Sequence, residues 1–93
     1  MRLRFTFRFQ QVGDTWLGSA VGQNAPLFNG VLQLNEVGYF IVSKLAELPD
    51  KQESELVIYL TDCLTNEYAV DRSTAQSAVI SVLDYLKAEQ VLE

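Results

Sequence analysis

Hydrophobic and polar residues alternate strictly along the first ten positions of the chain. Apolar residues occupy one face of this pattern and polar residues the other: Leu3, Phe5, Phe7 and Phe9 against Arg4, Thr6 and Arg8. An alternation with a period of two is typical of a β-strand with one buried face. The pattern therefore predicts a first strand over residues 3–9.

Turn signals divide the next part of the chain into two further strands. Gly13 and Asp14 suit a tight hairpin turn, because glycine adopts the positive φ that such turns require. The second strand is predicted over residues 15–21, and a turn-rich connection over residues 22–26 leads to a third strand over residues 27–34. Strands joined in this way form a three-stranded antiparallel β-meander, whose first and third strands are its edges.

After the third strand, the apolar residues recur at helical spacing. The pattern predicts three helices: residues 36–48, a helix that stops near Tyr68, and a third from Asp71 to Glu89. The first helix is apolar over most of its circumference, so we expect it to lie between the sheet and the other helices. The terminal pair Val91 and Leu92 is expected to fold back onto the core.

Short polar residues mark where these helices begin. Asn35 and Asp71 are predicted to cap the first and third helices, because their side chains accept hydrogen bonds from free N–H groups of the first turn. Asp50 with Glu53, or else Ser54, can cap the second.

The predicted element order is β-β-β-α-α-α. The 93 residues allow one domain, which covers residues 1–93. We therefore expect an α+β fold, in which a three-stranded antiparallel β-meander is followed by three helices and lies against them.

Composition argues against catalysis by this chain and against nucleic acid as its main partner. The net charge is −5, and the helical half carries the excess of acidic residues, which repel phosphate. Histidine is absent, and the single cysteine, Cys63, cannot form an internal disulfide or a metal site. We predict a protein that is not an enzyme and that uses no metal and no cofactor.

The hydropathy of the chain bears on its location. The sequence has no run of about 20 apolar residues and no signal peptide. We expect a cytoplasmic protein with no membrane partner.

Several short motifs resemble those of one protein family in their order and spacing. They are Phe28-Asn29-Gly30, Leu34-Asn35-Glu36-Val37-Gly38, Glu67-Tyr68 with Val70-Asp71 and Ala75, and the Leu83 and Leu86 face that leads to Val91-Leu92. Through these residues the chain resembles the PqqD family, the peptide chaperones of pyrroloquinoline quinone (PQQ) biosynthesis, and more broadly the domains that recognise ribosomal precursor peptides. It departs from the family pattern at Gln90, where a glycine commonly precedes the terminal hydrophobic pair.

The resemblance implies a winged-helix-like fold and a non-catalytic role. It implies that the chain binds the leader of a ribosomal precursor peptide as an added strand along the third strand, beside the third helix. It also implies that the peptide is presented to a separate modifying enzyme, a radical SAM-type maturase. The strand residues assigned to this site are Leu27, Phe28, Asn29, Gly30, Val31, Leu32 and Gln33.

An edge strand is a suitable peptide site, but its backbone hydrogen bonds need additional side-chain contacts to give useful affinity. An edge strand exposes backbone N–H and C=O groups that an extended peptide can pair with. Each such hydrogen bond contributes only about 0.5–1.5 kcal/mol net. Micromolar binding needs about −8 kcal/mol, so side chains must supply the rest.

Four residues of the predicted third helix are assigned to this role. Their spacing puts them on one shoulder of the helix, beside its buried stripe: Gln76, Ile80, Leu83 and Lys87. We expect Ile80 and Leu83 to form the floor of a groove with the outward-facing residues of the third strand, and Lys87 to attract an acidic residue of the peptide. Alternatively, Ile80 contacts the second helix or a second copy of the chain.

Two other functions fit the same elements. A winged-helix DNA-binding regulator would read DNA with the third helix, which is normally basic in such proteins. Here that helix has only two bases against three acids: Arg72 and Lys87 against Asp71, Asp84 and Glu89. A dimerisation domain would pair its exposed strands with those of a second copy, which gives a homodimer.

Overall fold

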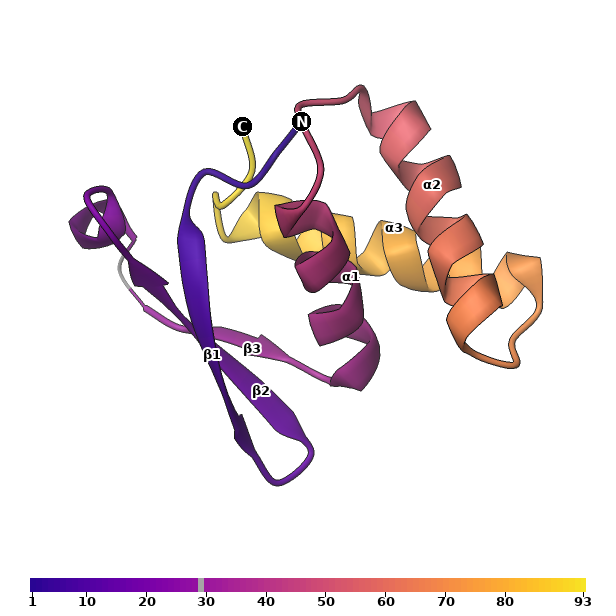
Figure 1. The fold of residues 1–93 in the computed structure, drawn as a ribbon, viewed down its shortest axis with the longest axis horizontal. Helices are drawn as coiled ribbons and strands as arrows, with labels where there is room; N and C mark the ends of the chain where they lie inside the picture. Colours follow the sequence, from indigo (N-terminus) through magenta and orange to yellow (C-terminus); the bar gives the residue numbers. More distant parts are fainter. Residues whose placement is uncertain (29) are drawn as a thin grey trace.

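Three strands, three α-helices and one short 3-10 helix are formed by the residues that the structure describes. The computed structural model describes residues 1–28 and 30–93. In chain order the elements are β1 (Thr6–Val12), β2 (Thr15–Val21), the 3-10 helix η1 (Ala25–Leu27), β3 (Leu32–Leu34), α1 (Glu36–Ala46), α2 (Glu53–Glu67) and α3 (Arg72–Ala88). Figure 1 shows the sheet to one side and the helices to the other. The predicted α+β fold is confirmed.

The sheet has the order β1-β2-β3, and both pairings are antiparallel. The predicted β-meander, with β1 and β3 at its edges, is therefore confirmed. The hairpin between β1 and β2 turns at Gly13, whose φ of +62° is a conformation that favours glycine. Phe9 pairs with Gly18, and its ring lies so close that a Cβ at Gly18 would be 2.6 Å from the ring carbon Cε1.

The third strand is much shorter than the predicted span of residues 27–34. Ala25–Leu27 forms η1, and among the described residues of that span only Leu32–Leu34 pairs with β2. Pro26 lies at the start of η1 and has no N–H to contribute to a sheet, which favours a turn here over a strand. The strand prediction was wrong for four residues, namely Leu27, Phe28, Gly30 and Val31, and Asn29 lies outside the described residues.

The first strand begins at Thr6 rather than at residue 3, because the chain before it pairs with the C-terminal segment. The backbone N–H of Arg2 donates to the carbonyl of Glu93 over 2.7 Å. The N–H of Arg4 donates to the carbonyl of Val91, over 2.8 Å, and the Val91 side chain is fully buried. The prediction that the C-terminal pair folds back onto the core is confirmed, and the two chain ends lie close together (Figure 1).

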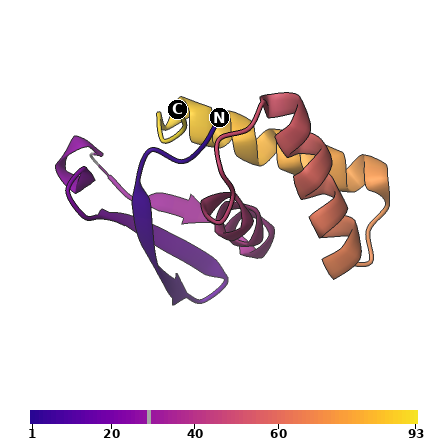
Figure 2. The same cartoon turned by 45° about the horizontal axis from the view of Figure 1, so that its top comes forward.

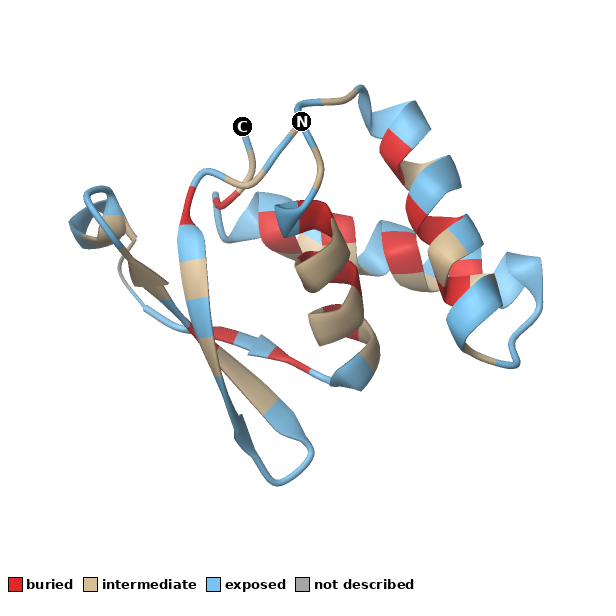
Figure 3. Cartoon of the chain, viewed as in Figure 1, coloured by how far each residue is buried: buried red, intermediate tan, exposed pale blue. Residues whose placement is uncertain are grey.

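Helix α1 lies between the sheet and the other two helices, as predicted. It contacts β2 and β3 on one side and α2 and α3 on the other. Figure 2 shows α1 nearly end-on in this position. Its residues Ile41, Val42 and Leu45 are buried, and they join a single apolar core to which β3, α2 and α3 also contribute (Figure 3).

Short polar side chains cap α1 and α3 at the predicted positions. Asn35 accepts a hydrogen bond from the N–H of Gly38 over 2.8 Å. Asp71 accepts one from the N–H of Thr74 over 3.3 Å. The prediction for α2 was wrong: the N-cap is Gln52, whose side chain makes no capping hydrogen bond. The aspartate expected to cap α2 instead pairs with the N-terminal amine of the chain.

Helix α3 ends in a turn that holds Gln90 in the left-handed conformation, with φ of +61°. The N–H of Gln90 donates to the carbonyl of Lys87, and the N–H of Val91 donates to that of Leu86, over 3.0 and 3.1 Å. These two bonds form a Schellman motif, in which glycine is favoured because it has no Cβ. Gln90 thus stands at the position of this motif that favours glycine.

Candidate functional site

The free edge of β3 faces helix α3. Leu32 and Leu34 pair with Gly18 and Trp16 of β2, and their side chains are buried in the core. Gln33 lies between them and is exposed. Its backbone N–H donates to the hydroxyl oxygen of Tyr85 on α3, over 3.0 Å. The backbone N–H of Gln33, at the edge of the sheet, therefore has its hydrogen-bond acceptor on α3.

Tyr85 is not among the site residues predicted from the sequence. The residue is half-buried on α3, at the margin of the stripe that faces the core. Tyrosine combines an apolar ring with a polar tip, so it suits a position where a buried surface meets an exposed backbone group. This residue type at the margin of an apolar stripe is the signal that could have identified it. Which flank of α3 faces β3 depends on how the two elements cross.

The strand residues assigned to the site differ in exposure. Leu27 and Val31 are exposed, by 69% and 47% of their surface. Gly30 and Gln33 are also exposed, whereas Leu32 is fully buried and offers only its backbone. Asn29 lies outside the described residues.

Phe28 anchors the segment between η1 and β3. Its ring lies 5.5 Å from that of Phe5 and 5.6 Å from that of Phe7, measured between ring centroids. The contact with Phe7 is edge-to-face, a favourable arrangement for aromatic rings. The segment that leads into β3 is therefore attached to the start of β1.

The four assigned residues of α3 lie with α2 rather than with β3. Gln76, Ile80 and Leu83 line a cavity of about 510 Å³ together with residues of α2. Lys87 forms an ion pair with Glu53, the first residue of α2. The structure thus brings the four together, on the flank of α3 that borders α2, and it does not bring them together with the β3 edge. That a peptide contacts them stays a prediction.

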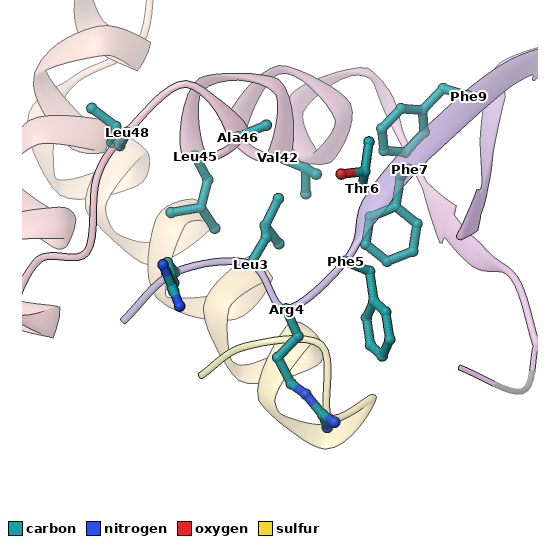
Figure 4. Close-up of a pocket in the computed structure, with 11 residues that line it drawn as sticks. Leu3, Arg4, Phe5, Thr6, Phe7, Phe9, Val42, Leu45, Ala46 and Leu48 are labelled. Carbon is teal, nitrogen blue, oxygen red and sulfur yellow. The ribbon is translucent and has the colours of Figure 1, made fainter. Parts of the chain in front are cut away.

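A second cavity borders the other edge strand. It has a volume of about 280 Å³ and lies between the start of β1 and the second half of α1, as Figure 4 shows. Its apolar lining includes Leu3 and Phe7 from the strand side and Val42 and Leu45 from α1. The chain just before β1 is already paired with the C-terminal segment, so part of this edge is closed by the protein's own backbone.

The ionisable groups with shifted pKa values lie in the helical half of the chain, either within α2 and α3 or in the segments that flank them: Asp50, Tyr59, Tyr68, Asp71 and Lys87. The hydrogen bond from Lys87 to Glu53, together with the charges of Glu53 and Asp84, raises the pKa of Lys87. Burial raises the pKa of Tyr68, and the nearby acidic groups add to this effect. Within residues 1–28 and 30–93, no cluster of three acidic or cysteine side chains is placed to hold a metal ion.

In the described part of the chain, every helix is too short or too polar to cross a bilayer.

Comparisons with known proteins agree with this arrangement of strands and helices. One solved structure, described as "TbiB1 in Complex with the TbiA(beta) Leader Peptide", is similar to this chain with a TM-score of 0.65 and 26% sequence identity. The similarity covers 100% of this chain and 95% of that one. A comparison with curated proteins gives no match. Residues 21–92 match the family described as "Coenzyme PQQ synthesis protein D (PqqD)", so the chain belongs to the PqqD family.

Proposed function

We propose that this protein binds the leader segment of a ribosomal precursor peptide as an added strand on the free edge of β3. The protein itself carries out no chemistry in this role and presents the peptide to a separate modifying enzyme. Membership of the PqqD family and similarity to a protein solved with a leader peptide support a peptide ligand. The position on β3 is supported by the geometry of the strand edge.

The observation that carries the proposal is the hydrogen bond between Gln33 and Tyr85. The N–H of Gln33 is directed away from β2 and is held only by a side-chain hydroxyl, over 3.0 Å. A peptide strand can offer a carbonyl to the same N–H and an N–H to the carbonyl of Gln33, which is how strands add to a sheet edge. Binding then requires Tyr85 to give up its contact with Gln33.

Backbone pairing alone does not give useful affinity. Four main-chain hydrogen bonds contribute about 2–6 kcal/mol in total, before the cost of association is subtracted. The exposed side chains of Leu27 and Val31 flank the edge in sequence and are available for apolar contacts with alternate residues of the peptide. The Tyr85 ring is available on the α3 side. These contacts supply the remaining affinity and select the peptide.

We further propose a radical SAM-type maturase as the modifying enzyme. Membership of a family that is described by its part in the synthesis of coenzyme PQQ supports this proposal. Because ribosomal peptides are made in the cytoplasm, the peptide and this protein meet there.

A homodimer formed through β1 is a second candidate assembly. β1 is an edge strand of seven residues, Thr6–Val12, and long edge strands tend to pair with other strands. Size-exclusion chromatography with light scattering gives the mass directly. A mass of one chain at every concentration tested would rule out this assembly.

The β3 site is tested with a fluorescein-labelled synthetic leader, copied from a short precursor peptide that a search of the reading frames next to this protein's gene identifies. Its affinity is measured for wild type, Gln33→Pro and Gln33→Ser. Proline removes the edge N–H and places its ring in the path of an added strand. We expect Gln33→Pro to bind at least about tenfold more weakly, because the proline ring keeps the peptide strand from pairing along the edge. This costs one or two hydrogen bonds beyond the one that Tyr85 gives up in wild type. Gln33→Ser keeps the N–H and should bind like wild type.

Two results would contradict the proposal at different levels. Equal binding by wild type and Gln33→Pro, with both folded by circular dichroism, would mean that the peptide does not add to β3. No binding of the leader to wild type would mean that peptide recognition itself is wrongly assigned.

A further inference from the structure

A groove between α2 and α3 exposes two isoleucine side chains that the core does not use. The cavity of about 510 Å³ has Val57 and the buried Leu83 in its lining. Ile58 of α2 and Ile80 of α3 line the same cavity and are exposed by 58% and 43% of their surface. Apolar residues gathered in a hollow of a small protein often mark a contact with another molecule.

The rim of this groove is acidic. Glu53 and Asp84 line the cavity beside the isoleucines. Between Glu53 and Ala88 the sequence has six acidic residues and two basic ones. Both basic residues already pair with carboxylates of the same layer, since Lys87 pairs with Glu53 and Arg72 with Asp62. Six acidic and two basic residues give this segment a net charge of −4, and Asp84 lines the groove outside both of these ion pairs.

We propose that this groove binds a cationic amphipathic helix of a partner protein. The hollow lies between two helices, and an amphipathic helix with apolar anchors fits such a hollow. Its lining on α3 runs from Gln76 to Asp84, about 12 Å at a rise of about 1.5 Å per residue, which is the length of roughly two helical turns. Two apolar residues spaced by three or four positions reach Ile58 and Ile80, and lysine or arginine residues beside them meet the acidic rim.

The charge of the rim argues against a second copy of the chain as the occupant. In a symmetric dimer the same patch meets itself, so the rim with Glu53 and Asp84 of one copy would lie against the same rim of the other. Each copy also has a net charge of −5. Like charges brought together at an interface destabilise a complex, whereas the positive charges of a basic helix are attracted to this rim.

This groove is separate from the β3 edge, and the inference does not depend on peptide binding there. Ile80 and Tyr85 are five residues apart, which is a rotation of about 140° around the helix at about 3.6 residues per turn. One flank of α3 faces β3 and the other borders the groove. Both surfaces can therefore be occupied at the same time.

The test uses two synthetic helical peptides of 14 residues as probes. Both have leucine at positions 4, 8 and 11; one has lysine at the exposed positions and the other glutamate. Binding to ¹⁵N-labelled protein is followed by NMR, and affinity by fluorescence anisotropy at 50 and 500 mM NaCl. We expect the lysine peptide to shift amides around Ile58 and Ile80 and to lose affinity at high salt. The glutamate peptide should bind at least tenfold more weakly.

Variants of the groove separate it from the rest of the surface. Ile58→Ser with Ile80→Ser should weaken binding of the lysine peptide at least tenfold, because two apolar contacts are lost. Val70→Ser is the matched control, since Val70 is exposed by 41% and does not line the groove, and it should bind like wild type. Thermal melting checks that the variants are folded.

Four outcomes would overturn the inference. Equal affinity for the lysine and glutamate peptides would mean that the acidic rim does not contribute to binding. Unchanged affinity in the folded double isoleucine variant, or NMR shifts centred elsewhere, would place the contact outside the groove. A dimer in light scattering that the two serine substitutions abolish would make a second copy the occupant.

Discussion

The hydroxyl of Tyr85 on α3 lies 3.0 Å from the backbone nitrogen of Gln33 on β3 and accepts its hydrogen bond. This contact joins the last helix to the last strand across 52 positions of sequence. It also occupies the group that an added strand would need. The side chain is therefore a competitor of the peptide in our proposal.

Tyr85→Phe removes this competitor and keeps the ring. We expect the leader peptide to bind about two- to tenfold more tightly, since one hydrogen bond of about 0.5–1.5 kcal/mol no longer has to be broken. The Gln33 amide should also exchange its hydrogen faster in the free protein. Fluorescence anisotropy and NMR hydrogen exchange measure the two effects. Tyr59→Phe, on the exposed side of α2, should change neither. Weaker binding by Tyr85→Phe would mean that the hydroxyl contacts the peptide.

Gln90 is strained by its left-handed conformation, with φ of +61°. That conformation costs a residue with a Cβ about 1–2 kcal/mol, whereas glycine adopts it freely but loses more entropy on folding. We expect Gln90→Gly to raise the free energy of unfolding by about 0.5–1 kcal/mol in urea denaturation. Glu89→Gly is the control, because Glu89 has right-handed helical geometry and should lose stability. A lower free energy of unfolding for Gln90→Gly than for wild type would mean that Gln90 is not strained in the folded protein.

Asn35 is the capping residue on which the junction of β3 and α1 depends. Its side chain accepts from the N–H of Gly38 over 2.8 Å. We expect Asn35→Ala to lower the free energy of unfolding by about 1 kcal/mol, a usual cost for losing such a cap. Gln52 holds the equivalent position on α2 without a side-chain cap, so Gln52→Ala should change stability far less. Urea denaturation compares the two, and equal losses would contradict the difference in capping.

Asp71 links the stability of α3 to pH. Its hydrogen bonds with Thr74 hold the pKa of the carboxyl below its ordinary value. A lowered pKa in the folded state stabilises the fold above the unfolded pKa of about 3.9 and loses this contribution as the pH falls through the folded value. Wild type should therefore lose stability more steeply below about pH 4 than Asp71→Asn, which caps without titrating. The melting temperature of each protein is measured from pH 7 to pH 3. An equal decrease of the melting temperature in both proteins would contradict this prediction.

Local patterns were sufficient to predict most of the elements. The alternation around Phe5 to Phe9 and the turn at Gly13 led to the hairpin, and helical spacing led to the three helices. The caps at Asn35 and Asp71 were also correct, because a cap depends on residues three positions apart. These features depend on contacts between near neighbours in sequence.

The errors arose where distant segments decide the structure. The start of β1 is set by pairing between Arg4 and Val91, which no local pattern reveals. The length of the third strand was overestimated. Part of the apolar run after Pro26 belongs to η1, and Phe28 packs against the rings of Phe5 and Phe7 at the start of the sheet.

The candidate site shows the same limit. Helical periodicity places Ile80 and Tyr85 on different flanks of α3. Periodicity does not determine which flank contacts the sheet. The residues predicted for the site lie on the flank that borders α2. Only the crossing of α3 over β3 brings Tyr85 to Gln33. The contact therefore could not be predicted without the tertiary structure.

The pairing of the first residues with the last three has a practical consequence. Since the carbonyls of Val91 and Glu93 hold the N–H groups of Arg4 and Arg2, the chain begins and finishes at one spot on the surface. A fluorescent label or a fused enzyme would occupy the same location whichever terminus carries it. A circular permutant that joins the old termini through a short glycine linker, with new ones opened at the Gly13 turn, should keep the same tertiary structure.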